Sequence, residues 1–256
     1  MVQSRYSFLA NIPPVTLNLL IINAIFLLAD TVLESRFGIN LSKFLGLHFI
    51  ESELFNPLQS ISYMFMHANF THLFFNMFGV YMFGSVLERI WGGKKFLFFY
   101  FIAGIGAALV QEVVWYVDYI SLTKNLDAQS FGAIMDIVNN EGRDLIAENK
   151  NYTDKILGGV NVLINVSTVG ASGSLFGVLF AFGFMFPQEK LMMIFIPIPI
   201  PARIFVIIYA VAELFFGVAN FKFDNVAHFA HLGGALFGLI IIFIWRKRGR
   251  LFNYKL

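Results

Sequence analysis

Six apolar stretches, each long enough to cross a lipid bilayer, dominate this chain of 256 residues. A helix needs about 20 mostly apolar residues to cross a hydrocarbon core roughly 30 Å thick. The stretches cover residues 15–33, 59–87, 96–117, 169–187, 202–220 and 226–245. Charged residues make up 13% of the chain, about half of their share in soluble domains. The sequence therefore predicts an all-α polytopic membrane protein, with residues 1–256 forming a single six-helix domain in the bilayer.

The distribution of lysine and arginine predicts how the helices are oriented. Both residues gather in the connections after the second and fourth stretches and in the C-terminal tail, as they do on the cytoplasmic side of membrane proteins. The other side receives residues 34–58, the "NFKFDN" turn and an acidic extramembrane insertion at 118–168, which we expect to be partly helical near 129–150. Both termini are therefore expected in the cytoplasm. The alternating prolines of "FIPIPIPAR" (195–203) predict an extended connection.

Composition also argues against several kinds of partner and chemistry. The net charge is +2, and there is no basic stripe that would indicate a nucleic-acid partner. The chain has no cysteine, so disulfides, thiol nucleophiles and cysteine-based metal sites are excluded. The first apolar stretch is longer than the core of a typical signal peptide and is expected to be retained. Without cysteine or an organelle presequence, a bacterial inner membrane is the expected location.

Four polar residues inside the apolar stretches are expected to lie at similar depths. Polar groups are costly at membrane depth, and each is therefore a functional hypothesis. Counting about 1.5 Å of rise per residue from the cytoplasmic end of each stretch gives about 22 Å for Ser172, 21 Å for His231, 20 Å for Asn76 and 26 Å for His72. All four are thus predicted in the outer part of the bilayer, within about one helical turn of each other.

Glycines beside the serine and the histidine suggest how these two residues meet. Each is accompanied by two glycines four residues apart, and these are Gly173, Gly177, Gly234 and Gly238. Small residues at this spacing let two helix backbones approach closely in lipid. The sequence therefore predicts that the fourth and sixth stretches pack together and bring Ser172 toward hydrogen-bonding distance of His231.

This set of residues would allow nucleophilic catalysis. His231 could take the proton of Ser172 as the serine attacks a carbonyl carbon, and then protonate the leaving amine. The Asn76 amide and the His72 ring lie four residues apart on one helix face, and they could stabilise the oxyanion together with the serine N–H. Phe176, one turn from the serine, could stack on the imidazole. No aspartate is evident to orient the imidazole, so a dyad rather than a triad is expected.

Each of these features also has a structural interpretation. A membrane serine and a glycine face, taken singly, are more often packing devices, and the His72–Asn76 pair could be an interhelical hydrogen bond. We expect His228 to be a solvated or capping residue rather than a second base. Glu213 could belong to a buried polar network or to an ion or proton path, and the sequence does not rank these roles.

The motifs that contain these residues resemble those of the rhomboid intramembrane serine proteases. The matching segments are "HANFTHLFFNM" (67–77), "GASG" (170–173) and "AHLGG" (230–234), in the family's order along a region from about Asn56 to Gly238. The resemblance implies a six-helix bundle with a short fourth helix that carries the nucleophile Ser172. It also implies His231 as general base, with Asn76 and His72 as oxyanion donors.

The resemblance further implies cleavage of single-pass transmembrane proteins near the outer face, without a cofactor or a metal, at a site open to that face. The insertion at 118–168 is much longer than the corresponding loop of compact bacterial members, and its role is left open. Two alternatives remain. One is a non-catalytic rhomboid-fold protein that binds transmembrane segments, and the other is a small transporter that uses Glu213 and the histidines as a proton relay.

Overall fold

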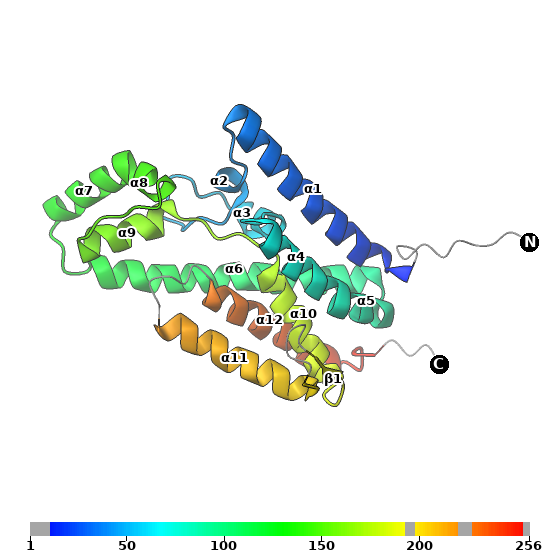
Figure 1. The fold of residues 1–256 in the computed structure, drawn as a ribbon. Helices are drawn as coiled ribbons and strands as arrows, with labels where there is room; N and C mark the ends of the chain where they lie inside the picture. The colour runs from blue at the N-terminus through cyan, green and yellow to red at the C-terminus, as the bar shows by residue number, and fades with distance from the viewer. Residues whose placement is uncertain (1–10, 193–197, 220–226, 253–256) are drawn as a thin grey trace, which may run out of the picture.

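The computed structural model describes residues 11–192, 198–219 and 227–252, and they form a helical membrane bundle (Figure 1). Within these ranges, five helical segments are long and apolar enough to cross a membrane. They are α1 (Pro14–Phe37), the run Phe70–Trp91, α6 (Gly93–Thr123), α11 (Ala202–Ala219) and α12 (His228–Lys247). The all-α polytopic fold is therefore confirmed, and four of the six predicted stretches coincide with α1, α6, α11 and α12 to within six residues.

The second predicted stretch is not one continuous helix. It begins with the short α3 (Gln59–Ser62) and the 3-10 turn η2 (Tyr63–Phe65), after which the chain becomes extended. A new helix starts where the Asn69 side chain accepts a hydrogen bond of 2.9 Å from the backbone N–H of His72. This cap satisfies a donor that the helix itself leaves free. The prediction of an unbroken span over 59–87 is therefore wrong.

The helical run that follows the break continues beyond the predicted end. It comprises α4 (Phe70–Gly79), the π-helical turn η3 (Val80–Gly84) and α5 (Ser85–Trp91). It ends at Gly92, whose φ of +80° lies in the region that favours glycine. The run is long enough to cross the membrane on its own, even though residues 59–69 lie outside it.

The short helix α10 (Ser172–Met185) lies at the centre of the bundle (Figure 1). Its 14 residues span about 21 Å, less than the hydrocarbon thickness of roughly 30 Å. Nearly all of its side chains are buried, and it packs on α4, α6, α11 and α12. The helix starts at the serine rather than at residue 169. The predicted short helix that carries the serine is therefore present.

Glycines bring α10 and α12 into backbone contact. A Cβ atom at Gly234 would overlap the carbonyl oxygen of Gly173, and a Cβ atom at Gly238 would lie 2.9 Å from the Cα atom of Gly177. Only hydrogen atoms fit between the two backbones at these points. The predicted packing of the two glycine faces is confirmed.

Because of this contact, Gly234→Ala is expected to destabilise the protein strongly. The added methyl group must push α12 away from α10, and overpacking of this kind costs about 1–3 kcal/mol or more. The matched control is Gly132→Ala, at an exposed helix position where a Cβ would meet nothing within 4 Å. Thermal unfolding in detergent should show a lower midpoint for Gly234→Ala and an equal or higher midpoint for Gly132→Ala. Equal midpoints for Gly234→Ala and the wild type would contradict the packing argument.

The insertion between α6 and α10 forms a small helical layer. It contains α7 (Ala128–Ile137), the π-helical turn η4 (Val138–Gly142), α8 (Arg143–Ala147) and α9 (Lys155–Asn165). The expected helical content near 129–150 is therefore confirmed. α6 continues to Thr123, six residues beyond the predicted end of its span. The layer lies at the end of the bundle opposite the start of α1 and the strand β1 (Lys190–Leu191) (Figure 1).

A separate apolar core holds the insertion against the end of α6. Its buried residues come from the loop between α2 (Ser42–Leu45) and α3, from α6, from η4 and from α9, and they are Phe49, Tyr119, Val138, Val160, Leu163 and Ile164. The amide of Asn165 also donates a hydrogen bond of 3.0 Å to the carbonyl of Val138. The insertion is therefore an ordered part of the fold rather than a loose loop.

Shorter elements complete the connections. They are α2 (Ser42–Leu45) and the antiparallel strands β1 (Lys190–Leu191) and β2 (Ile200–Pro201). The described part of "FIPIPIPAR" is extended up to Pro201, as predicted, while its first residues lie outside the described ranges. The "NFKFDN" turn also lies outside the described residues.

Candidate active site

Ser172 is the first residue of α10 and is held in place by the chain that precedes it. Leu47 and Thr168 exchange two backbone hydrogen bonds, of 2.9 and 2.8 Å. Two residues further on, the N–H of Gly170 donates a hydrogen bond of 2.9 Å to the carbonyl of Tyr63. Gly170 has a φ of +130°, which side chains rarely allow. These contacts direct the partly exposed serine toward the interior of the bundle.

The imidazole of His231 lies directly against the serine. Its Nε2 atom is 2.8 Å from the Oγ atom of Ser172, which is a hydrogen-bonding distance. The His231 side chain is only 12% exposed. The structure therefore brings together Ser172 and His231, which the sequence paired by their predicted heights in the membrane and by the neighbouring glycines.

Aromatic rings fix the plane of this imidazole. Phe176 stacks on His231, with ring centroids 4.3 Å apart and an angle of 9° between the planes. Tyr209 of α11 also stacks on Phe176, with ring centroids 5.1 Å apart and an angle of 11° between the planes. The predicted stacking contact is present, and Tyr209 extends it to a third helix. Sequence reasoning missed Tyr209, because nothing in the sequence indicates how α11 is rotated.

A carboxylate contacts the second ring nitrogen of His231. The Oε2 atom of Glu213 is 3.0 Å from Nδ1, and the glutamate is only 7% exposed. Sequence reasoning did not pair Glu213 with this imidazole, because it considered only an aspartate as the partner of the ring. Counting from Ala202 places Glu213 about 17 Å above the cytoplasmic end of its stretch, which is roughly a turn below the height of His231. That depth was a usable signal, and the long glutamate side chain covers the remaining distance.

His228 contacts the same carboxylate oxygen. Its Nδ1 atom lies 2.6 Å from Oε2 of Glu213, and its side chain is 10% exposed. Its ring also stacks on Phe216, with centroids 5.8 Å apart. The expectation of a solvated or capping residue is wrong, because His228 belongs to a buried polar cluster one helical turn from His231.

The three members of this cluster could also bind a metal ion. One ligand atom from each of Glu213, His228 and His231 lies within 4.8 Å of the other two. Two histidines and a glutamate form a known ligand set for zinc. Metal binding would displace the Nδ1 protons that can otherwise bond to the carboxylate. The expected reaction without a metal or cofactor stays a prediction.

His72 and Asn76 lie on the face of α4 that is turned toward α10. A Cβ atom at Gly170 would lie 2.9 Å from Nε2 of His72 and 3.6 Å from Oγ of the serine, so the ring and the hydroxyl border the same small space. Asn76 donates from Nδ2 to the carbonyl of His72 at 2.9 Å. Its buried Oδ1 atom has no hydrogen-bond partner among the described residues. One turn on, Gly79 packs against Leu175 of α10.

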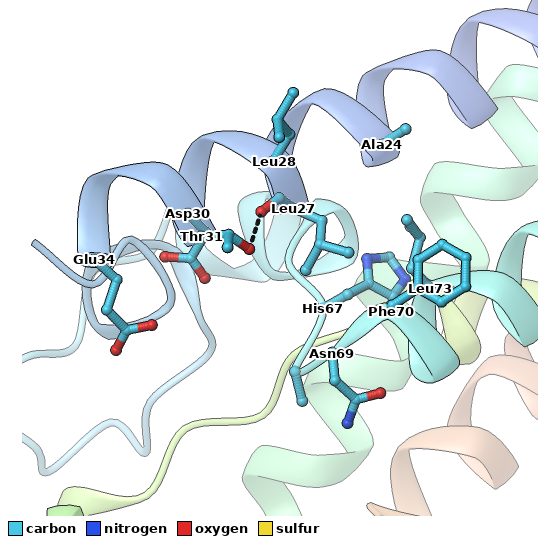
Figure 2. Close-up of a pocket in the computed structure, with 11 residues that line it drawn as sticks. Ala24, Leu27, Leu28, Asp30, Thr31, Glu34, His67, Asn69, Phe70 and Leu73 are labelled. Atoms are coloured by element: carbon cyan, nitrogen blue, oxygen red, sulfur yellow. Dashed lines mark hydrogen bonds between the residues drawn. The ribbon is translucent and has the colours of Figure 1, made fainter. Parts of the chain in front are cut away.

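A groove of about 600 Å³ lies between α1 and the start of α4 (Figure 2). Its lining includes His67, whose ring nitrogens are buried without a partner among the described residues. The rings of His67 and His72 meet edge to face, with centroids 5.1 Å apart. The described residues that line the groove come from α1, from α4 and from the loop before α4, so the groove does not include the serine.

The fold and the site together define a polytopic membrane protein with a serine–histidine pair in its interior. Residues 55–248 match the family model of the rhomboid domain, which covers most of the chain. The chain therefore belongs to the rhomboid family.

Two curated proteins illustrate the relationship. Rhomboid protein 1, mitochondrial, of Saccharomyces cerevisiae is 26% identical over 185 residues, which are 72% of this chain and 41% of that protein. Rhomboid protease AarA of Providencia stuartii is 42% identical over 55 residues, which are 22% of this chain and 20% of that protein. The chain thus spans less than half the length of these relatives.

Proposed function

We propose that this protein is an intramembrane serine endopeptidase that cleaves single-pass transmembrane proteins near the outer face of the membrane. The observation that carries the proposal is the 2.8 Å contact between Oγ of Ser172 and Nε2 of His231. Membership of the rhomboid family supports it, and the Providencia relative bears the name of a protease.

The reaction would proceed through an acyl-enzyme. Oγ of Ser172 attacks the scissile carbonyl carbon while Nε2 of His231 accepts the hydroxyl proton. The tetrahedral intermediate collapses, the C–N bond breaks, and the imidazolium gives its proton to the leaving amine. A water molecule then attacks the acyl-enzyme with His231 again as base, and the serine is released with its proton. Stacking on Phe176 keeps the ring in the plane that both proton transfers need.

Three donors are available for the oxyanion. The backbone N–H of Ser172 belongs to the first turn of α10, where N–H groups have no partner within the helix. Asn76 uses Nδ2 in one hydrogen bond to the His72 carbonyl, which leaves its second amide hydrogen for a substrate. The His72 ring borders the same space beside Gly170. Such donors stabilise charge that develops in the transition state.

Asn76→Ala should therefore lower kcat about 10²-fold, the usual cost of losing one oxyanion donor, with little change in KM. The matched control is Asn140→Ala, because this asparagine lies exposed in the insertion and bonds to Asp136 of its own segment. Cleavage of a fluorescent single-span substrate in detergent measures both constants. A kcat for Asn76→Ala within twofold of the wild-type value would remove Asn76 from the proposed oxyanion site.

We further infer the setting of this reaction. The protein is an integral membrane protein, and we place it in a bacterial inner membrane with both termini in the cytoplasm. The start of α1 and the end of α12 lie at the same end of the bundle as β1, which supports this orientation (Figure 1). The partners would be transmembrane protein substrates in the lipid bilayer, with no nucleic acid.

An experiment in liposomes distinguishes cleavage from the alternative function, which is binding of transmembrane segments without cleavage. Purified protein and a fluorescent single-span substrate would be reconstituted together in liposomes. The proposal expects two fragments, with the cut near the outer end of the substrate helix. A substrate that stays intact while it co-purifies with the protein would instead support a non-catalytic binding protein.

A further inference from the structure

We propose that Glu213 of α11 positions the imidazole of His231, so that the site works as a serine–histidine–glutamate triad. This inference rests on the proposed function, which by itself requires only the serine and the histidine. It assigns a role to a membrane carboxylate that the dyad does not use.

Each ring nitrogen of His231 has an oxygen partner. Oε2 of Glu213 lies 3.0 Å from Nδ1 of His231, and Oγ of Ser172 lies 2.8 Å from Nε2. An ionised carboxylate can only accept hydrogen bonds, so this contact requires the proton on Nδ1. Nε2 is then unprotonated and can accept the serine proton. The carboxylate thereby selects the tautomer that the proposed base needs, and its charge stabilises the imidazolium formed in the reaction.

A carboxylate at the buried position of Glu213 is costly unless it has polar partners. Much of α11 presents exposed apolar side chains, including Ile207, Val211 and Leu214, as expected for a helix that faces lipid. Glu213 is turned the other way and is buried. A carboxylate at membrane depth is retained only where it finds partners. Its partners here are the two histidines of α12.

α11 restrains the ring at two points. Tyr209, one turn before Glu213, stacks on Phe176, which in turn stacks on His231. The ring plane and the Nδ1 direction are thus both set by residues that depend on the position of α11. Any displacement of α11 away from α12 would release the imidazole from both restraints.

His228 has a supporting role in this arrangement. It lies three residues before His231 and donates to the same Oε2 atom at 2.6 Å. This second hydrogen bond helps to hold the carboxylate oxygen in front of Nδ1. His228→Phe keeps an aromatic ring beside Phe216 and removes the hydrogen bond, so it should lower kcat by a small factor, about threefold.

The first test compares carboxylate variants in the cleavage assay. Glu213→Gln keeps the size of the side chain and removes its charge, and it should lower kcat at least about tenfold while KM stays within twofold. Glu213→Asp should fall between Glu213→Gln and the wild type. The control Glu112→Gln makes the same change in α6, where the carboxylate accepts a bond from the backbone N–H of Ile50, and should match the wild type.

The second test reads the tautomer directly and does not depend on activity. Nitrogen-15 NMR of histidine-labelled protein should show His231 protonated at Nδ1 and not at Nε2 in the wild type, and a mixture of tautomers in Glu213→Gln. A ring protonated at Nε2 in the wild type would overturn the inference. So would a kcat for Glu213→Gln within twofold of the wild-type value.

These outcomes are separable from failure of the proposed function. If the wild type neither cleaves a substrate nor reacts at Ser172, the protease proposal fails, while the tautomer measurement still decides whether Glu213 positions the ring. If the wild type cleaves and Glu213→Gln cleaves equally well, only the triad fails. Loss of wild-type activity on addition of a zinc chelator would also overturn the triad, in favour of a metal bound by Glu213, His228 and His231.

Discussion

Ser172→Ala is expected to reduce cleavage of a single-span substrate by at least about 10⁴-fold. The reason is that the proposed first step forms a bond between Oγ and the substrate carbonyl carbon, and alanine has no atom that can form it. The serine is partly exposed at the start of α10, so its loss should leave the packing of the bundle unchanged. Thermal unfolding of the variant should therefore resemble that of the wild type.

A second serine in the same helix provides the control. Ser174 is fully buried, and its hydroxyl contacts the sulfur of Met64 at 3.1 Å rather than the histidine. Ser174→Ala should keep cleavage within about twofold of the wild-type rate, because it touches no reacting atom. Retention of even a tenth of the activity in Ser172→Ala would contradict the assignment of the nucleophile.

His231→Phe is the second substitution with a large expected effect, again about 10⁴-fold in kcat. Phenylalanine preserves an aromatic ring that can stack on Phe176, but it has no nitrogen to accept the serine proton. The stacked geometry, with centroids 4.3 Å apart, makes this a gentler change than removal of the whole ring. The same fluorescent assay measures the loss, with circular dichroism as a check on folding.

The neighbouring histidine is the matched comparison for this substitution. Both imidazoles contact the carboxylate of Glu213, but only His231 lies within hydrogen-bonding distance of Ser172 among the contacts of the described residues. His228→Phe should therefore cost far less activity than His231→Phe. The opposite order would identify His228 as the base and would contradict the proposed mechanism.

The pairing of Ser172 with His231 could be predicted from the sequence because it depends on regular quantities. The rise per residue of a helix gave their common depth, and a spacing of four residues put glycines on one face of each helix. The contact of Gly173 with Gly234 follows from that pattern. The expected Phe176 stacking likewise rests on a spacing of one helical turn from Ser172.

Other features of the site depend on tertiary geometry, and helix rise and residue spacing could not predict them. The rotation of α11 decides whether Glu213 faces lipid or the histidines, and neighbouring helices set that rotation. The helix break before Phe70 was hidden because apolar residues continue on both sides of the Asn69 cap. The π-helical turn η3 also shifts the register of the residues that follow it.

The most direct test of the central claim is covalent labelling of the wild-type protein with a fluorophosphonate. Oγ of an activated serine forms a bond to phosphorus and fluoride leaves, so the adduct marks the nucleophile. Peptide mass spectrometry should locate the adduct on Ser172, and the labelling should disappear in His231→Phe. Wild-type protein that cleaves its substrate while it carries no adduct on Ser172, or that carries the adduct on another residue, would contradict the account.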